Sequence, residues 1–177
     1  MSTETPITLK EIQRRLKVPQ HILIHLCEKG VIEPDHQQTS GRGVRREFSR
    51  RNLFEFAQAM SLRNFEIPVA TTAAIIRLTR SFARACRKMI PDFELPDYLN
   101  QHKIDLSLYL YDGQYLVFSA TQPSAKPLRL GFDLGKVLAS PTTTAKVDRL
   151  DDLPTDYDSY LHLGLSRIAR RIFDDPS

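Results

Sequence analysis

The sequence has no tryptophan, only two cysteines and only seven glycines among its 177 residues. Cys27 and Cys86 lie far apart and form no CxxC pair, so we expect two free, buried thiols in a reducing compartment and no metal site. The chain also lacks a run of 18 apolar residues and an N-terminal basic stretch followed by an apolar one. We therefore expect no membrane-spanning helix, no signal peptide and a cytoplasmic location.

The motifs of common catalytic sites are missing as well. There is no GxGxxG, no phosphate-binding Walker loop, no HExxH and no GxSxG. His21 and His25 are four residues apart, but we interpret them as exposed polar residues rather than as metal ligands. The acid-rich stretch 148–158 is too polar to separate the pKa values of a catalytic carboxylate pair. We expect neither enzyme activity nor a cofactor.

Acidic residues are scarce in the first half of the chain. The formal net charge is +4, but residues 1–90 carry 16 Lys and Arg against 8 Asp and Glu, whereas residues 91–177 carry 9 against 13. This asymmetry indicates two functional units, which we place at residues 1–90 and 91–177. The excess positive charge falls on the first unit, where it favours a polyanionic partner.

Two short helices are predicted at the start of the first unit. Thr8 and Glu11 have the spacing of a capping box, and the following apolar residues predict a helix over Leu9–Leu16. A second helix is predicted over residues 19–29, with Pro19 at its first position and Gly30 ending it. Two short helices joined by a tight turn are typical of a helix-turn-helix.

The residues after the second helix predict a hairpin. Residues 31–34 are expected to be extended and residues 35–43 to form a polar loop. The alternating residues 44–48 then predict a returning strand, or wing. A third helix is expected over residues 49–64, capped by Ser49.

These segments together resemble the DNA-binding domain of the MerR-type transcriptional regulators. The resemblance covers roughly residues 7–76, and the residues that carry it are Thr8, Leu9, Lys10, Glu11 and Ile12, then residues 18–23 and 28–34, then Arg46, Glu47, Phe48, Ser49 and Leu53. It implies a winged helix-turn-helix that binds double-stranded DNA as a homodimer at a promoter or operator. RNA polymerase is a further candidate partner, and the nucleoid is the implied location.

The residues expected to contact DNA lie on the second helix and the wing. Members of the family usually carry an Arg and a Tyr in the middle of the second helix, but this chain has Ile24 and Leu26 there, which cannot bind a phosphate. We therefore predict base contacts from Gln20, His21 and His25. Phosphate contacts are predicted from the arginines in and beside the wing, namely Arg42, Arg45, Arg46, Arg50 and Arg51.

The remainder of the chain predicts an α+β fold. A fourth helix is expected from Thr71 or Thr72 to Met89, and residues 91–96 read as a linker. Four strands are then expected in an antiparallel sheet, near residues 104–111, 114–120, 128–134 and 146–150, with a turn at Asp112 and Gly113. A closing helix is expected to be capped by Thr155 and Asp158. The fold class is thus a mostly helical winged helix-turn-helix plus a small C-terminal α+β domain for dimerisation or sensing.

Two surfaces are candidates for the dimer interface. The apolar residues of the fourth helix are spaced as a short heptad seam, and those of the closing helix form a second stripe. The first set comprises Ile75, Leu78, Phe82, Ala85 and Met89, and the second comprises Leu161, Leu165, Ile168 and Ile172. We expect the C-terminal domain to contribute to assembly, assisted by the fourth helix.

Three functions fit these patterns. The first is a sequence-specific transcriptional regulator of the MerR type. The second is an architectural, excisionase-like factor that bends DNA with the same fold, although such chains are usually shorter. The third is a protein-interaction adaptor built on a winged helix, which the apolar Ile24 and Leu26 favour and the arginine-rich wing opposes.

Overall fold

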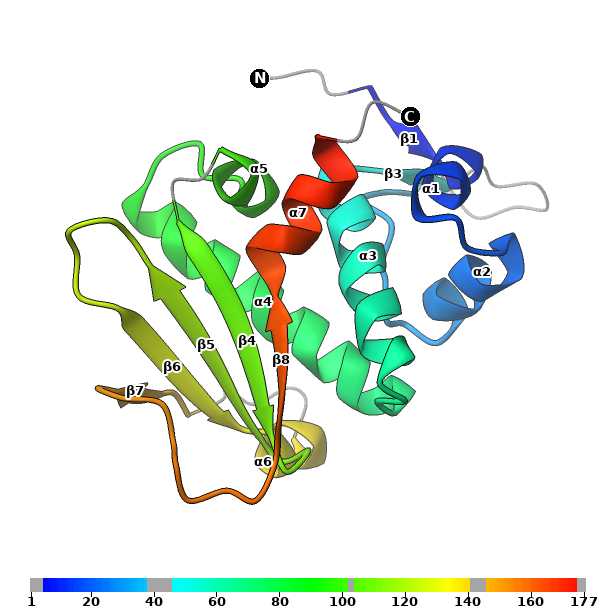
Figure 1. Cartoon of the computed structure of the whole chain (residues 1–177). Helices are drawn as coiled ribbons and strands as arrows, with labels where there is room; N and C mark the ends of the chain where they lie inside the picture. Colours follow the sequence, from blue (N-terminus) through cyan, green and yellow to red (C-terminus); the bar gives the residue numbers. More distant parts are fainter. Residues whose placement is uncertain (1–4, 38–45, 102–103, 141–145, 175–177) are drawn as a thin grey trace. The chain divides into compact units, whose positions relative to one another are not determined.

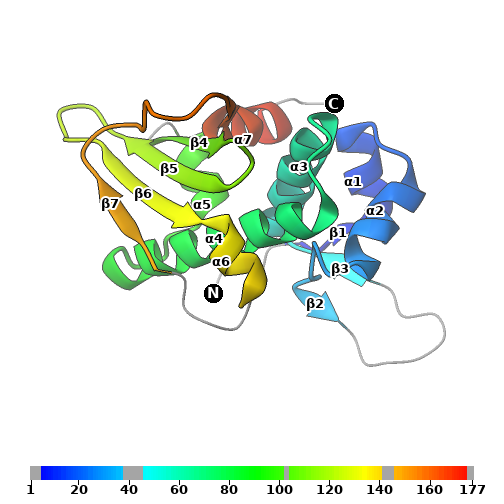
Figure 2. The same ribbon diagram turned by 90° about the horizontal axis from the view of Figure 1, so that it is seen from below.

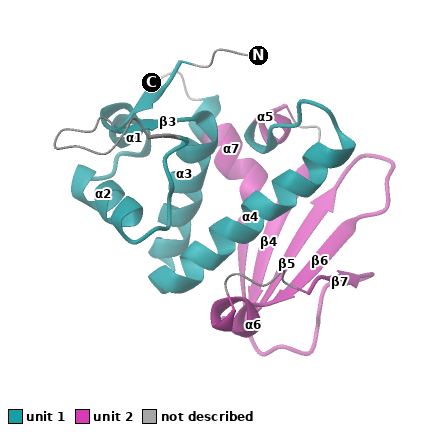
Figure 3. Ribbon diagram, turned by 180° about the vertical axis from the view of Figure 1, so that it is seen from behind, with its two compact units in different colours: residues 1–96, 172–177 teal, residues 97–171 magenta. Residues whose placement is uncertain are grey.

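The computed structural model describes residues 5–37, 46–101, 104–140 and 146–174, and over these residues it combines seven helices with eight strands. The expected α+β class is confirmed at this level. The chain divides into two compact units, one of residues 1–96 with 172–177 and one of residues 97–171 (Figure 3). The sequence placed the boundary after residue 90, and the border between the compact units lies at Pro96.

The first unit begins with the two expected helices, α1 (Leu9–Leu16) and α2 (Gln20–Glu28). The Thr8 hydroxyl accepts a hydrogen bond from the backbone N–H of Glu11 at 3.2 Å, which caps α1 as predicted. Lys17 ends α1 in the left-handed conformation with φ 54°. Pro19 is the N-cap of α2 instead of its first helical residue, so this boundary differs from the prediction by one position.

Gly30 ends α2 as the sequence indicated. Its φ of +66° is accessible to glycine without strain, and its N–H donates to the carbonyl of Cys27. The N–H of Val31 donates to the carbonyl of Leu26, which completes a Schellman motif. The chain then turns inward, and Val31 and Ile32 are buried.

A small antiparallel sheet follows, with the strand order β1-β3-β2 (Figure 2). The strands are β1 (Ile7–Thr8), β2 (His36–Gln37) and β3 (Arg46–Phe48). The strand at β3 was expected, although residues 44 and 45 lie outside the described part of the chain. Residues 31 and 32 form a bend and none of residues 31–34 belongs to a strand, so the prediction that they are extended is not confirmed. The partner strand β2 starts inside the expected polar loop. Strand β1 was not foreseen, because two residues carry too little pattern to recognise.

The core of the first unit is built on α3 (Arg50–Asn64) and α4 (Val69–Met89). Ser49 and Asn52 form a reciprocal capping box at the start of α3. α3 is buried on nearly all sides, including the polar side chains of Glu55 and Gln58. The amide of Gln58 donates to the Thr79 hydroxyl at 3.0 Å and so joins α3 to α4.

The second unit contains a five-stranded antiparallel sheet in the order β7-β6-β5-β4-β8 (Figure 1). Its strands are β4 (Asp105–Tyr111), β5 (Tyr115–Thr121), β6 (Leu128–Asp133), β7 (Asp148–Leu150) and β8 (Tyr160–Gly164). The four strands foreseen in the sequence are present. Asp112 and Gly113 both have positive φ, as the predicted hairpin turn requires.

The two faces of this sheet differ in character. One face carries the buried leucines of β4 with Leu116, Phe118, Phe132 and Leu163. The other face carries an aromatic layer, in which Tyr109 stacks on His162 with ring centroids 4.7 Å apart. The further members of this layer are Tyr111, Tyr115, Tyr157 and Tyr160. Within this layer Tyr111 is only 3% exposed, and the Tyr115 hydroxyl donates a hydrogen bond to Asp148 at 3.1 Å.

Three helices of this part of the chain departed from the predictions. α5 (Leu95–Asn100) occupies part of the expected linker, and α6 (Leu134–Ala139) follows β6 directly, with Asp133 as its N-cap. The closing helix α7 (Leu165–Phe173) begins about ten residues later than predicted. Residues 160–164 instead form β8, in which Leu161 pairs with Leu110 of β4, so the interpretation of Thr155 and Asp158 as its cap was wrong.

Candidate nucleic-acid interface

The exposed side of α2 carries the three polar residues that the sequence singled out. Leu23 and Leu26 are buried, which fixes the rotation of the helix about its axis. Gln20 and His21 are consequently exposed, and His25 is half-buried. α2 has no side-chain hydrogen bond at its N-cap, Pro19, and of its first backbone N–H groups that of Ile22 donates to the Pro19 carbonyl at 3.1 Å.

Arg46 lies on the small sheet close to α2. It pairs with Gln37 in the antiparallel register of β3 and β2 and is half-buried. Its guanidinium is near enough to Cys27 of α2 to favour the thiolate, although burial has the larger effect and raises the pKa of the Cys27 thiol. The structure therefore brings Arg46 and α2 together. Arg42 and Arg45, also predicted to contact DNA, lie outside the described residues.

Arg50 and Arg51 make contacts within the protein that the sequence did not predict. The guanidinium of Arg50 lies 4.1 Å from the ring centroid of Phe173, a cation–π geometry. Arg51 forms an ion pair with Asp35, and its Nε lies 3.8 Å from a carboxylate oxygen of Glu55. Phe173 and Asp35 come from segments distant in the sequence, so these contacts attach the beginning of α3 to them.

Two lysines were missed as candidates. A shallow hollow beside the turn between α1 and α2 is lined by Thr8, Lys10, Glu11, Gln13, Arg14, Lys17, Val18 and Pro19. Lys10 and Lys17 are exposed there, whereas Arg14 is paired with Glu11 at 2.9 Å. The sequence could have indicated Lys10 and Lys17 as candidates, because they lie at the two ends of α1, next to a helix predicted to contact DNA.

The residues predicted to form the dimer interface have unequal exposure. Ile75, Leu78 and Phe82 are buried within the chain, and Met89 is 74% exposed. Ala85 is exposed as well.

The second predicted set lies in β8 and α7. Leu165, Ile168 and Ile172 are buried and Leu161 is half-buried. The exposed apolar surface of the predicted sets is therefore concentrated at the end of α4.

The described part of the chain, residues 5–37, 46–101, 104–140 and 146–174, also bears on other kinds of site. There, no group of three or more His, Cys, Asp and Glu side chains has the arrangement of a metal site. Cys27 and Cys86 are free thiols and half-buried, and burial raises the pKa of both. None of the described helices is both long enough and apolar enough to cross a membrane.

No protein-family model matches the sequence, and a search of curated proteins finds no significant match.

Proposed function

We propose that this protein is a sequence-specific DNA-binding transcriptional regulator in which α1, α2 and the small sheet act as a winged helix-turn-helix. The observation that carries the proposal is the juxtaposition of α2 and β3. The exposed Gln20 and His21 on α2 and the guanidinium of Arg46 on β3 belong to one compact unit with an excess of positive charge. A helix in the major groove with a cationic strand beside it is the arrangement that this fold uses.

Each residue has a distinct task in this proposal. Gln20 is suited to a bidentate contact with adenine, and His21 and His25 provide further polar groups toward base edges. Arg46 and Lys10 contact phosphates and set the position of the domain on the duplex. The uncapped N-terminus of α2 offers backbone N–H groups and a positive dipole end to one more phosphate.

A second candidate function is supported by two residues on α2. Ile24 is half-exposed and Glu28 is exposed, and neither side chain favours a phosphate backbone. A surface that mixes apolar and acidic groups suits a protein partner better than DNA. The alternative is therefore an adaptor whose α2 binds another protein, and salt-dependent DNA binding discriminates between the two.

The decisive test is selection of bound sequences from a random DNA pool, followed by affinity measurements at several salt concentrations. We expect a recovered consensus, and Arg46→Ala should lower affinity on every sequence and reduce the salt slope by about one unit. Gln20→Ala should relax preference at one base position and leave non-specific binding unchanged. Arg149→Ala is the matched control, because Arg149 is exposed on another three-residue strand, β7, in the second unit.

The outcomes separate the hypotheses. Failure to recover any consensus, together with an affinity that Arg46→Ala leaves unchanged, would contradict the DNA-binding function and favour the adaptor. A palindromic consensus would support binding as a two-fold dimer, because one helix-turn-helix contacts too few base pairs to select a genomic site. In that dimer we expect Met89 to lie at or near the interface, since it is the most exposed apolar residue of the predicted seam.

A further inference from the structure

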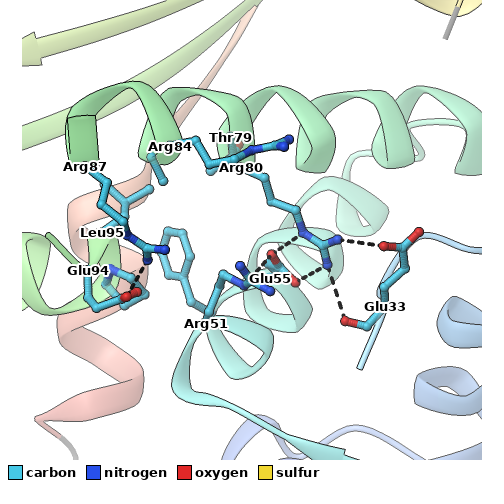
Figure 4. Close-up of a pocket in the computed structure, with 12 residues that line it drawn as sticks. Glu33, Arg51, Glu55, Thr79, Arg80, Arg84, Arg87, Glu94 and Leu95 are labelled. Atoms are coloured by element: carbon cyan, nitrogen blue, oxygen red, sulfur yellow. Dashed lines mark hydrogen bonds and ion pairs between the residues drawn. The ribbon is translucent and has the colours of Figure 1, made fainter. Parts of the chain in front are cut away.

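A pocket of about 260 Å³ lies between α3 and α4 of the first unit (Figure 4). Its wall combines four arginines, three glutamates and several apolar side chains. The lining residues are Glu33, Arg51, Phe54, Glu55, Thr79, Arg80, Ala83, Arg84, Arg87, Glu94, Leu95 and Pro96. The volume is near the lower limit of ligand pockets, about 300 Å³, so any occupant is small.

The three glutamates of the pocket already have cationic partners. The Arg80 guanidinium donates to both carboxylate oxygens of Glu55, at 2.6 and 2.7 Å, and a third N–H reaches Glu33 at 3.2 Å (Figure 4). Arg87 binds Glu94. The acceptors of the pocket are therefore occupied, and a cationic ligand would have to displace an arginine.

Donor groups, in contrast, remain available. Arg84 is exposed and forms no hydrogen bond or ion pair with any described residue. The Nε of Arg51 is buried without a hydrogen-bond partner, at 3.8 Å from Glu55. Arg51 also lines the pocket and its side chain is 38% exposed, so an oxyanion in the pocket would gain charge-assisted hydrogen bonds from the guanidinium groups of Arg84 and Arg51. Phe54 and Leu95 offer apolar surface beside these donors.

We propose that this pocket binds a small organic anion, with a carboxylate or phosphate group held by Arg84 and Arg51 and an apolar body packed on Phe54 and Leu95. Charge-assisted hydrogen bonds from guanidinium groups suit both kinds of oxyanion. The apolar contact makes an organic anion a better ligand than an inorganic one.

The pocket is connected to the small sheet through the loop that enters β2. Arg51 binds Asp35, and the side-chain amide of Asn52 binds the Asp35 N–H and the Glu33 carbonyl, at 3.0 and 2.9 Å. An anion that draws Arg51 away from Asp35 would weaken this attachment one residue before β2. Occupancy would then alter the position of the wing, a regulatory consequence that rests on the proposed DNA-binding function.

Calorimetric titration of the full chain with phenyl phosphate, in the absence of DNA, tests the site itself. We expect saturable binding that Arg84→Ala weakens about tenfold, as the loss of a charge-assisted hydrogen bond implies. Arg77→Ala is the matched control, because Arg77 lies seven residues earlier on α4, is exposed and does not line the pocket. Circular dichroism melting of each variant verifies that it is folded.

Three results would overturn the site: no binding of phenyl phosphate at millimolar concentration, an equal loss in Arg77→Ala, or equal binding of the uncharged benzyl alcohol. The regulatory step is measured separately, as the change in affinity for the selected DNA when phenyl phosphate is added. Unchanged DNA affinity with the site occupied would overturn that step alone. Calorimetric binding by a protein that binds no DNA would support the anion site and contradict the proposed function.

Discussion

Arg80 of α4 and Glu55 of α3 form a two-pronged ion pair, with Nε–Oε1 and NH2–Oε2 distances of 2.6 and 2.7 Å. The Glu55 side chain is only 2% exposed and that of Arg80 is 16% exposed, so the pair has little access to water. The pairing with Glu55 is the main reason that the pKa of Arg80 is raised. The same arginine also binds Glu33, which ties the chain after α2 to the two long helices.

Removal of the buried acid should be strongly destabilising. Glu55→Ala leaves the Arg80 charge without its main partner, and we expect the free energy of unfolding to fall by about 3–5 kcal/mol in a denaturant titration. Adding Arg80→Leu to this variant should recover part of the loss. Glu33→Gln is the control, because Glu33 is 77% exposed and its ion pair with Arg80 should contribute less than about 1 kcal/mol. Similar losses for Glu55→Ala and Glu33→Gln would contradict the structural role of the pair.

The end of α3 can be improved by one substitution. Glu66 follows its C-cap with φ 58°, its N–H donates to the Arg63 carbonyl, and the Ile67 N–H donates to the Leu62 carbonyl. A non-glycine residue in this left-handed position costs about 1–2 kcal/mol, so Glu66→Gly should raise stability by about 1 kcal/mol. Gly30→Ala at the corresponding position of α2 should lower stability by a similar amount. Thermal and denaturant unfolding measure the change in stability of each variant. If Glu66→Gly and Gly30→Ala changed stability in the same direction, this account would be refuted.

The N-terminal helix should respond to acid through Glu11. Hydrogen bonds from Arg14 and then Arg15 lower the pKa of Glu11 from 4.5 to about 2. A pKa that is depressed by folding adds stability above the unfolded value, and this stability is lost as the pH falls from about 4.5 to about 2. Glu11→Gln should therefore reduce stability at neutral pH and flatten the acid limb of the stability curve. Unfolding measured across this pH range tests the prediction, with Glu28→Gln as the control because Glu28 is exposed. An acid limb that Glu11→Gln leaves unaltered would contradict the stabilising role of Glu11.

The aromatic layer of the second unit depends on the absence of a side chain at Gly131. A Cβ there would lie 2.0 Å from the Tyr115 hydroxyl and 2.7 Å from the ring carbon that bears it, while this hydroxyl donates to Asp148 at 3.1 Å. Gly131→Ala should displace the ring, break this hydrogen bond and cost about 1–3 kcal/mol.

Titration of tyrosinate absorbance provides a second measurement of the same substitution. Burial, followed by the hydrogen bond to Asp148, raises the pKa of Tyr115 to about 12. A raised pKa favours the folded state below pH 10, and that contribution is lost as the pH rises from 10 to about 12. In Gly131→Ala the pKa of Tyr115 should move back toward 10. A tyrosine titration identical to that of the original protein would show that the ring does not lie over Gly131.

The sequence by itself determined the features that depend on residues three or four positions apart. The Thr8 and Ser49 caps, the Gly30 helix end and the turn at Asp112 and Gly113 are set by local backbone geometry and by hydrogen bonds within one turn, so a short window of sequence contains them. The exposed side of α2 was also predictable, because the spacing of its leucines fixes which residues face outward.

Only the tertiary structure decided features that depend on distant partners. Residues 160–164 have an apolar pattern compatible with a helix or a strand, and they became β8 because β4, some fifty residues earlier, offered a free edge for backbone hydrogen bonds. Arg50 and Arg51 looked equivalent to the other arginines near the wing, yet Phe173 and Asp35 engage them within the protein. Charge can be counted in a sequence, but the availability of a charge for a ligand depends on which neighbours the fold has brought within hydrogen-bonding distance.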